Sequence, residues 1–247
     1  VDGGSISNLG EFAVGWTGSY NTATISGGGD LLTGGQAANV GDYGSHNELT
    51  VTGNGSTLRV LDAGTGGNYD GRLTLGFTGG SSDNTLTVTS GGMVTNTGDE
   101  GIWIGGGTDC SRNQLIVEGS GSEVYVTDLR LGSRGDNGLL EVRDGGYMEV
   151  ATSSLMAWHS SSESTTLRVV DTGSELHIQG SLTVSYNSDS GGVGGHGGKQ
   201  LIQVHTGGTL NVDSSLNLNN ASTATRGNRM EVIGAGALAD AEGQRRR

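Results

Sequence analysis

The chain of 247 residues contains no proline and only one cysteine, Cys110. A single cysteine cannot form an internal disulfide, so the fold must be stabilised in another way. Aromatic residues make up 4% of the sequence and charged residues 16%. No run approaches the roughly 18 consecutive apolar residues of a membrane-spanning helix. We therefore expect neither a disulfide-stapled scaffold nor a membrane-spanning helix within these residues.

Positive charge is scarce as well. Lysine and arginine together number 13 against 26 aspartates and glutamates, which gives a formal net charge of −13. This balance disfavours nucleic acid, because phosphate binding requires basic patches, and it disfavours an acidic polysaccharide. No Cys/His cluster has the spacing of a metal site, and the G-G-x-G-x-D motif of calcium-binding solenoids is missing. We expect no cofactor and no metal centre, while the acidic loops leave calcium binding open.

Glycine is abundant instead, with 49 residues, and its distribution is periodic. A five-residue element recurs every 25 to 37 residues. Its copies are NTATI (21–25), NELTV (47–51), NTLTV (84–88), NQLIV (113–117), GLLEV (138–142), TTLRV (165–169), QLIQV (200–204) and NRMEV (228–232). Glycine richness with such a period indicates a repeat architecture rather than disorder.

Two further short elements follow each copy. A second apolar position lies six or seven residues after the final Val or Ile, at Leu31, Leu58, Val94, Val124, Met148, Leu176, Leu210 and Leu238. A third element has the form apolar-x-apolar-small and reads FAVG (12–15), ANVG (38–41), LTLG (73–76), IWIG (102–105), LRLG (129–132), LMAW (155–158), LTVS (182–185) and LNLN (216–219). Alternation with a period of two predicts strands with one buried face.

Three strands per repeat predict an all-β chain folded as a right-handed parallel β-helix of about eight coils. With roughly 4.8 Å between neighbouring strands, the rod would be about 40 Å long. We expect a single domain over 1–247, with a partial first coil at 1–20, a partial last coil at 228–240 and a polar, basic tail at 241–247.

The repeat also resembles a known protein class. Its motif L-x-V-x-G-x-G-S-x-L-x-V followed by L-x-[IL]-G stands here as LTVTGNGSTLRV with LTLG, and as LIVEGSGSEVYV with LRLG. This motif is similar to the repeats of bacterial secreted and cell-surface β-helix proteins, including autotransporter passenger regions. The resemblance covers about residues 20 to 240. It implies an extracellular or cell-surface location and a structural or adhesive role.

Asparagines recur two residues before the first buried position. They are Asn21, Asn47, Asn84, Asn113 and Asn228, with Gln200 in the same register and Gly138 and Thr165 as interruptions. Asparagine tolerates the left-handed backbone of tight corners, and stacked amides can hydrogen-bond from coil to coil. We interpret these residues as a structural ladder rather than a ligand site.

Three local motifs are explained by the repeat. Asn54-Gly55-Ser56 and Asn220-Ala221-Ser222 match the N-glycosylation triplet, but chance matches are expected in so Asn- and Ser-rich a chain. Gly55 occupies a recurring turn position. The glycine-rich stretch before Lys199 departs from the phosphate-loop pattern, because Val193 and Gln200 replace required residues. We interpret that stretch as a corner loop.

Outward columns on the first two sheets could carry chemistry. The column of the first sheet comprises Thr50, Thr87, Ile116, Glu141, Arg168, Gln203 and Glu231. Glu141 and Arg168 are expected to form an exposed ion pair. The column of the second sheet comprises Arg59, Thr95, Tyr125, Glu149, His177 and Asn211. Tyr125, Glu149 and His177 in adjacent coils could support acid–base chemistry, although a mixed solvated face is the favoured interpretation.

The outward column of the third sheet comprises Thr74, Trp103, Arg130, Met156, Thr183 and Asn217. Trp103, Arg130 and Met156 are expected side by side, with Trp158 and His159 replacing the small corner residue next to them. An exposed aromatic ring beside arginine can stack on a sugar or anchor a partner. Trp103, Arg130, Trp158 and His159 are therefore candidate binding residues, although a structural role is favoured.

The two ends look like complementary partial coils. The first coil enters with FAVG, and the last coil stops after Leu238, before a third strand. We expect a structural, non-enzymatic protein whose partner is another copy of itself, stacked head to tail into a filament. A piece cut from a longer repeat array explains the same ends, and a start at Val1 fits either a removed signal peptide or an excised segment. The alternative function is a carbohydrate-binding or polysaccharide-cleaving β-helix.

Overall fold

The computed structural model describes residues 1–8, 10–34, 37–62, 71–159, 162–185, 198–218 and 227–241. These residues contain no helix and form 25 strands in three sheets, in which every neighbouring pair of strands is parallel. The chain visits the three sheets in turn once per coil. The prediction of an all-β parallel β-helix with three strands per coil and about eight coils is confirmed.

The sheets are named in the order used for the repeat elements above. The first sheet contains β3 (Thr22–Ile25), β6 (Glu48–Thr52), β9 (Thr85–Thr89), β12 (Gln114–Glu118), β15 (Leu139–Arg143), β18 (Thr166–Val170), β21 (Leu201–His205) and β24 (Arg229–Ile233). The second sheet contains β1 (Ser5–Asn8), β4 (Asp30–Gly34), β7 (Thr57–Leu61), β10 (Met93–Asn96), β13 (Glu123–Val126), β16 (Tyr147–Val150), β19 (Glu175–Ile178), β22 (Thr209–Val212) and β25 (Leu238–Ala241). The third sheet contains β2 (Phe12–Val14), β5 (Ala38–Val40), β8 (Leu73–Leu75), β11 (Ile102–Ile104), β14 (Leu129–Leu131), β17 (Ser154–Met156), β20 (Leu182–Val184) and β23 (Leu216–Asn217).

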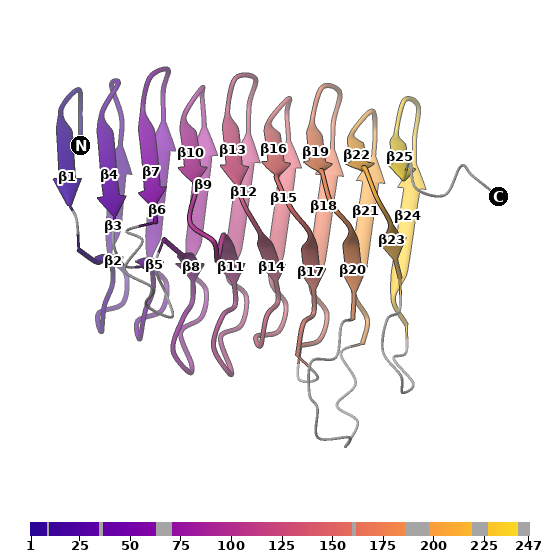
Figure 1. Ribbon diagram of the computed structural model, residues 1–247, viewed down its shortest axis with the longest axis horizontal. Helices are drawn as coiled ribbons and strands as arrows, with labels where there is room; N and C mark the ends of the chain where they lie inside the picture. The colour runs from indigo at the N-terminus through magenta and orange to yellow at the C-terminus, as the bar shows by residue number, and fades with distance from the viewer. Residues whose placement is uncertain are drawn as a thin grey trace.

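The coils stack along one axis (Figure 1). The chain descends in front through β10 and β11, returns upward behind through β12, and moves toward the C-terminus with each circuit. This sense of winding is right-handed, as the connection rule for parallel strands leads one to expect.

One continuous hydrophobic core runs through the coils. In β6, Leu49 and Val51 are buried while Glu48 is exposed, so alternate side chains point inward. The same register is kept from coil to coil, since Leu49 pairs with Leu86 and Val51 with Val88. Identical aliphatic side chains thus stack in columns, and each coil buries the apolar surface of its neighbours.

The expected register of the third-sheet strand β17 is wrong by one residue. Met156 is fully buried in the core, and Leu155 pairs with Arg130 on the outer face. The strand begins at Ser154, whose side chain is buried, and Ala157 takes the left-handed corner position with φ of 56°. A shift of one residue exchanges the two faces of a strand. Trp158 therefore follows the corner rather than replacing its small residue.

The turn from the first sheet to the second alternates between two lengths. The second buried position follows the first by six residues in one coil (Val88 to Val94) and by seven in the next (Val117 to Val124). The last turn is of the longer kind, so Ala239 pairs with Leu210. Leu238, which was expected to point inward, is 50% exposed.

One position in this turn alternates accordingly between glycine and a small residue. It reads Gly29, Ser56, Gly92, Ser122, Gly146, Ser174, Gly208 and Ala237. Each serine Oγ accepts the N–H of a glycine in the preceding coil, at distances of 3.1, 3.1 and 3.0 Å from Gly28, Gly91 and Gly145. A Cβ at Gly92, Gly146 or Gly208 would collide with a valine carbonyl of the preceding coil. The structural repeat is therefore a pair of coils.

The asparagine register forms the expected ladder. Asn47 donates from its backbone and its side chain to Asn84 Oδ1 at 3.0 and 2.9 Å, and Asn84 does the same to Asn113. Asn21 is bonded likewise to Asn47, and Gln200 accepts from Thr165 N–H and donates through its own N–H to Asn228. These bonds lie between coils and form two runs, from Asn21 to Asn113 and from Thr165 to Asn228, with the interruption at Gly138.

The expected reason for asparagine at this position is wrong. The left-handed residue of the corner is the one before it, with φ of 62° at Tyr20, 57° at His46 and 58° at Asp83. Asparagine is required by its amide, which lies beneath a glycine of the preceding coil. A side chain at Gly41 or Gly76 would run into the amide of Asn84 or Asn113.

The expectation of complementary partial coils is also wrong. The terminal strands β1 and β25 both belong to the second sheet. The first coil therefore supplies strands of the second and third sheets, and the last coil supplies strands of the first and second. Sequence inspection missed β1 because its residues, SISN, carry only one large apolar side chain, Ile6.

Two of the motifs considered above can be placed only in part. Asn54 lies in an exposed turn, in which Gly55 has a φ of 79°. The second triplet, 220–222, and the glycine-rich residues 186–197 lie outside the described residues, as do residues 242–247 of the expected tail.

The alternating turn gives a matched pair of substitutions. We expect Gly146→Ser to lower the free energy of unfolding by about 1–3 kcal/mol, because its Cβ would strike a carbonyl in a packed position. Ser122→Gly removes one buried hydrogen bond and should cost only about 1 kcal/mol. Urea denaturation followed by circular dichroism measures both. A larger loss for Ser122→Gly than for Gly146→Ser would contradict the two-coil repeat.

Candidate functional site

Three aromatic rings and two arginines gather on the outer face of the third sheet. Trp103 on β11 pairs with Arg130 on β14, as the sequence predicts. Arg130 Cζ lies 4.3 Å from the ring centroid of Trp103 and 4.5 Å from that of Trp158. The two indoles meet edge to face, with centroids 5.8 Å apart and an interplanar angle of 78°. Leu155, rather than Met156, is the next outward residue.

Arg72 and Phe77 extend this cluster, and sequence reasoning missed both. Arg72 is fully buried, and its Cζ lies 4.2 Å from the Phe77 ring and 4.5 Å from the Trp103 ring. Guanidinium groups therefore alternate with aromatic rings along five side chains. Arg72 has no basic equivalent in the other coils, so the repeat gives no signal for it. Phe77 follows the corner residue Gly76, a register that also holds Trp16 and Trp158, and this recurrence could have found it.

Arg130 and Trp103 have polar partners beside the cluster. Arg130 Nε lies 3.1 Å from Asp128 Oδ2, and Trp103 Nε1 donates to the Glu100 carbonyl at 2.9 Å. Burial raises the pKa of Asp128, against the opposing effect of the Arg130 charge. His159 is half-buried and is held by its backbone N–H on the Ser133 carbonyl. Both indole rings thus have guanidinium groups against them, which fits a structural cluster better than an open binding platform.

The second-sheet column has the expected order, since Tyr125 pairs with Glu149 and Glu149 with His177. His177 Nε2 lies 3.0 Å from Asp213 Oδ1, whereas its Nδ1 lies 3.9 Å from Glu149 Oε2. Tyr125 donates its hydroxyl to Glu123 instead of Glu149, and burial raises its pKa. The phenol therefore stays protonated and acts as a donor rather than a base.

Glu149 itself is held by two neutral donors. Tyr147 donates its hydroxyl to Glu149 Oε2 at 2.8 Å, and Gln179 Nε2 donates to Oε1 at 3.0 Å. Burial is the main cause of a raised pKa at Tyr147, and the Glu149 carboxylate adds to it. Both carboxylate oxygens are thus occupied by side chains of the same face. This arrangement is an inter-coil hydrogen-bond network of the kind expected on a mixed solvated face.

The ion pair on the first sheet is more buried than expected. Arg168 Nη1 lies 2.9 Å from Glu141 Oε1, but the Glu141 side chain is only 6% exposed. Arg143 contacts Glu141 Oε2 at 3.2 Å and Glu118 Oε2 at 2.5 Å. Four charged side chains on three neighbouring strands lie in two adjacent outward columns, and the arginines cover the Glu141 carboxylate. The two arginine side chains therefore remain in contact with solvent, as expected, but Glu141 is buried.

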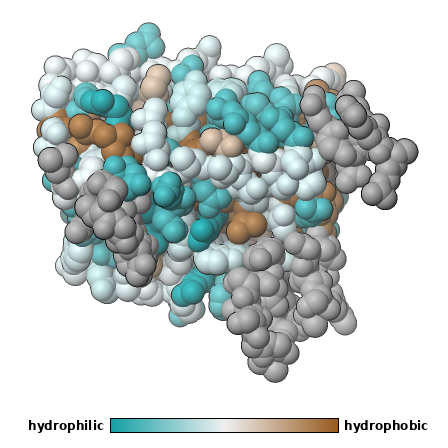
Figure 2. Space-filling view, in the orientation of Figure 1, coloured by the Kyte–Doolittle hydropathy of each residue, from teal (hydrophilic) through white to brown (hydrophobic). Residues whose placement is uncertain are grey.

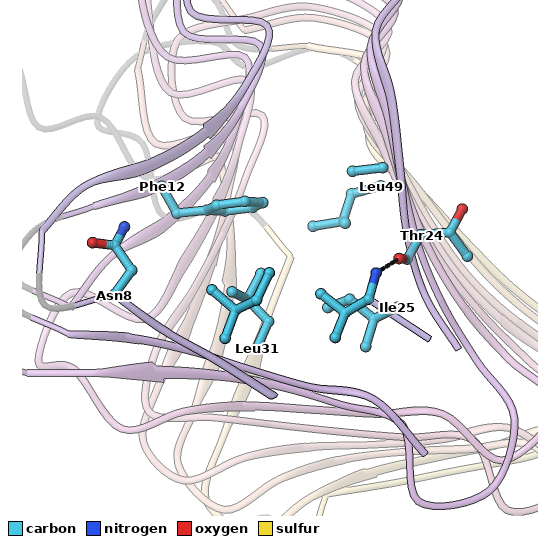
Figure 3. Close-up of a pocket in the computed structure, with 9 residues that line it drawn as sticks. Asn8, Phe12, Thr24, Ile25, Leu31 and Leu49 are labelled. Carbon is cyan, nitrogen blue, oxygen red and sulfur yellow. Dashed lines mark hydrogen bonds between the residues drawn. The ribbon is translucent and has the colours of Figure 1, made fainter. Parts of the chain in front are cut away.

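A cavity of about 420 Å³ opens at the N-terminal end of the core (Figure 3). Phe12, Leu31 and Leu49 point into it from three different strands. The amine of Val1 donates to the Thr24 carbonyl at 2.6 Å on one side. The cavity lies at the level where a further first-sheet strand would pair with the free edge of β3.

Other reactive groups are sparse within the described ranges. No group of three or more His, Cys, Asp or Glu side chains there is placed to hold a metal ion. Cys110 is buried, its Sγ lies 3.0 Å from the Thr78 carbonyl, and burial raises its pKa, which keeps the thiol protonated near neutral pH. No helix suited to crossing a membrane is found in the same ranges. The face in Figure 2 is mostly neutral or hydrophilic, with separate apolar patches.

Comparison with protein-family models, with curated proteins and with solved structures found no match to this chain.

The Arg130 stack gives a test of its structural role. We expect Arg130→Ala to lower the free energy of unfolding by about 2 kcal/mol, because two cation–π contacts are lost and Asp128 loses its partner. The near-ultraviolet circular dichroism of the two indoles should weaken as well. Arg112→Ala is the matched control, since that arginine pairs with Asp83 on the surface and has no cation–π contact with a ring among the described residues. Equal effects of both substitutions on the urea midpoint would contradict the role of the stack.

Proposed function

We propose that this chain is a structural β-solenoid of the extracellular space or cell surface, acting as a rod or as a subunit of a head-to-tail filament, without enzymatic activity. The location rests on the resemblance of the repeat motif to bacterial secreted and surface β-helix proteins, including autotransporter passengers. An adhesive role belongs to the same resemblance.

The observation that carries the proposal is that both end faces present core positions to solvent. At the N-terminal end, Ile6 is 49% exposed beside the cavity. At the C-terminal end, Val232 is 47% exposed although it continues the column of Val204, which is fully buried. Exposed core side chains and free edges of parallel strands favour the addition of another coil.

The strand order limits how tight this contact is. If β25 of one copy meets β1 of the next, one strand position stays open in the first sheet, between β24 and β3. Another stays open in the third sheet, between β23 and β2. Only the second sheet then has a continuous backbone ladder across the junction. We therefore expect reversible association that depends on concentration.

Two end-face substitutions test the contact. Ile6→Asp and Val232→Asp should each suppress end-to-end association, because a carboxylate would replace an apolar group at the junction. Asn54→Asp adds the same charge in the exposed turn between β6 and β7, away from both end faces, and should have no effect. Sedimentation velocity over a concentration series and negative-stain electron microscopy report particle length.

The proposal fails if the unmodified chain stays as dispersed short rods at every concentration. It also fails if Asn54→Asp suppresses association as strongly as the end-face variants, because the contact would then involve the sides of the rod. Circular dichroism of each variant separates loss of association from loss of folding.

A second function is favoured by the half-exposed rings of Trp103 and Trp158, which suit a carbohydrate-binding or polysaccharide-cleaving β-helix. Their contacts with Arg130 make it the weaker candidate. Release of reducing ends from any polysaccharide by the unmodified chain, and its loss in His177→Ala, would favour this alternative over a structural role.

A further inference from the structure

Two consecutive corner loops carry exposed aromatic rings that the candidate sites do not include. Residues 15–21 read GWTGSYN and residues 41–47 read GDYGSHN, so the loops share the pattern G-x-x-G-S-x-N. Trp16 is 49% exposed, Tyr20 76% and Tyr43 55%. Within the described ranges, no other Trp, Tyr or Phe is comparably exposed. We call Trp16, Tyr20, Tyr43 and His46 the corner patch.

The backbone of the corner patch is held in register. Tyr43 N–H donates to the Trp16 carbonyl at 2.7 Å, and Tyr20 N–H donates to the Ser45 carbonyl at 3.1 Å. Asn21 and Asn47 join the loops from beneath through the amide ladder. The rings are therefore presented by a preformed surface, which lowers the entropic cost of binding.

The rings leave open faces. Trp16 and Tyr43 have centroids 6.4 Å apart and are tilted by 43°, so neither covers the other. Tyr20 stacks on His46 at 4.8 Å with an angle of 5°, which covers one face of Tyr20 and leaves the other free. His46 Nε2 in turn lies 3.9 Å from Asp83 Oδ2, a carboxylate that Arg112 contacts at 2.6 Å. This openness contrasts with the third-sheet cluster, in which arginines lie against the rings.

The backbone conformation at Tyr20 is one that disfavours an aromatic side chain. Its φ of 62° is left-handed, and a bulky aromatic side chain is disfavoured there relative to Gly, Asn or Asp. Other coils place His46, Asp83, Arg112, Asn137, Ser164, Lys199 or Gly227 at the equivalent corner, so bulky side chains occur there but the fold itself does not demand an aromatic residue. The ring at this corner is best explained by a use at the surface.

The composition of the patch indicates the chemistry of its ligand. The two loops contain no Lys, Arg, Leu, Ile, Val or Met, and they combine aromatic faces with the hydroxyl of Thr17. The Ser19 and Ser45 hydroxyls are used within the corners, since Ser19 Oγ accepts from Ser45 N–H and Ser45 Oγ donates to the Gly80 carbonyl. Aromatic faces pack against the C–H face of a sugar ring, while phenol, indole N–H and hydroxyl groups reach its hydroxyls. The absence of basic residues and the overall charge of −13 disfavour an acidic glycan.

We propose that the corner patch binds a neutral oligosaccharide or polysaccharide. The rings occupy different positions of the two loops, since Trp16 lies opposite Asp42 and Tyr43 opposite Thr17, so they spread over the corner instead of stacking in one column. Rings spread over two coils suit a ligand of several linked sugar units better than a single sugar ring. The proposal is independent of end-to-end stacking, because the patch lies on the corner loops and not on the core face.

Binding of defined neutral hexasaccharides tests the proposal. Glucose-, mannose-, xylose-, galactose- and N-acetylglucosamine-based hexamers, with acidic oligogalacturonate for comparison, are titrated into the full chain by isothermal calorimetry. At least one neutral hexamer should bind, and Trp16→Ala or Tyr43→Ala should weaken that binding by about tenfold or more. Tyr20→Phe keeps the stacking face and should retain most of the affinity.

Tryptophan fluorescence locates the site without relying on affinity alone. Saturating sugar should change the emission of the unmodified chain and of Trp158→Phe, but not that of Trp16→Phe, because Trp16 is the reporter in the corner patch. Asn54→Ala, in an exposed turn, is the control for unspecific effects.

Three outcomes would overturn the proposal: no neutral hexamer binds, only the acidic oligomer binds, or Trp16→Ala and Tyr43→Ala bind as well as the unmodified chain. Loss of binding in Trp158→Phe with no loss in Trp16→Ala would assign the sugar to the third-sheet cluster instead.

Discussion

Every coil of this protein depends on the hydrogen bonds that join it to the coils on either side. A single coil has three short strands, and their backbone N–H and C=O groups point toward the neighbouring coils. These groups have no partner within the coil, so only stacking satisfies them. The same contacts bury the columns of Leu and Val that form the core. With no disulfide among the described residues and no helix, stability is the sum of interfaces between neighbours.

The corners show how close this stacking is. The Asn84 amide occupies the space directly against Gly41 of the preceding coil, so hydrogen bonding and steric exclusion act at the same point. The turn on the opposite edge uses serine where room exists and glycine where a carbonyl of the previous coil blocks a Cβ. The high glycine content is therefore a consequence of coil-to-coil approach as much as of backbone freedom.

The sequence predicted the strands and most of their registers because inward aliphatic residues recur at fixed spacing. The register prediction failed where an apolar residue did not lie at the spacing of the inward position. Leu155 and Leu238 are apolar but point outward, since the connection lengths place Ser154 and Ala239 on the inward positions. Counting six residues from Met148, as in the two later coils, would have found Ser154. The Arg72–Phe77 contacts could not be predicted, because they depend on side-chain conformation outside the repeat.

A solenoid whose coils are nearly interchangeable has few positions at which anything specific can be recognised. Most outward columns carry Thr, Asn or paired charges, which neighbouring coils satisfy among themselves. Specific recognition is therefore expected at positions whose residues differ from those of the other coils. In the Trp103 cluster, the aromatic side chains that differ from the repeat pack against arginine and against one another. At the first two corners, the rings of Trp16 and Tyr43 are held by the backbone ladder but left uncovered. A ring that is uncovered but held on a rigid support loses little conformational freedom when a ligand binds. This is the physical reason to look for a ligand there.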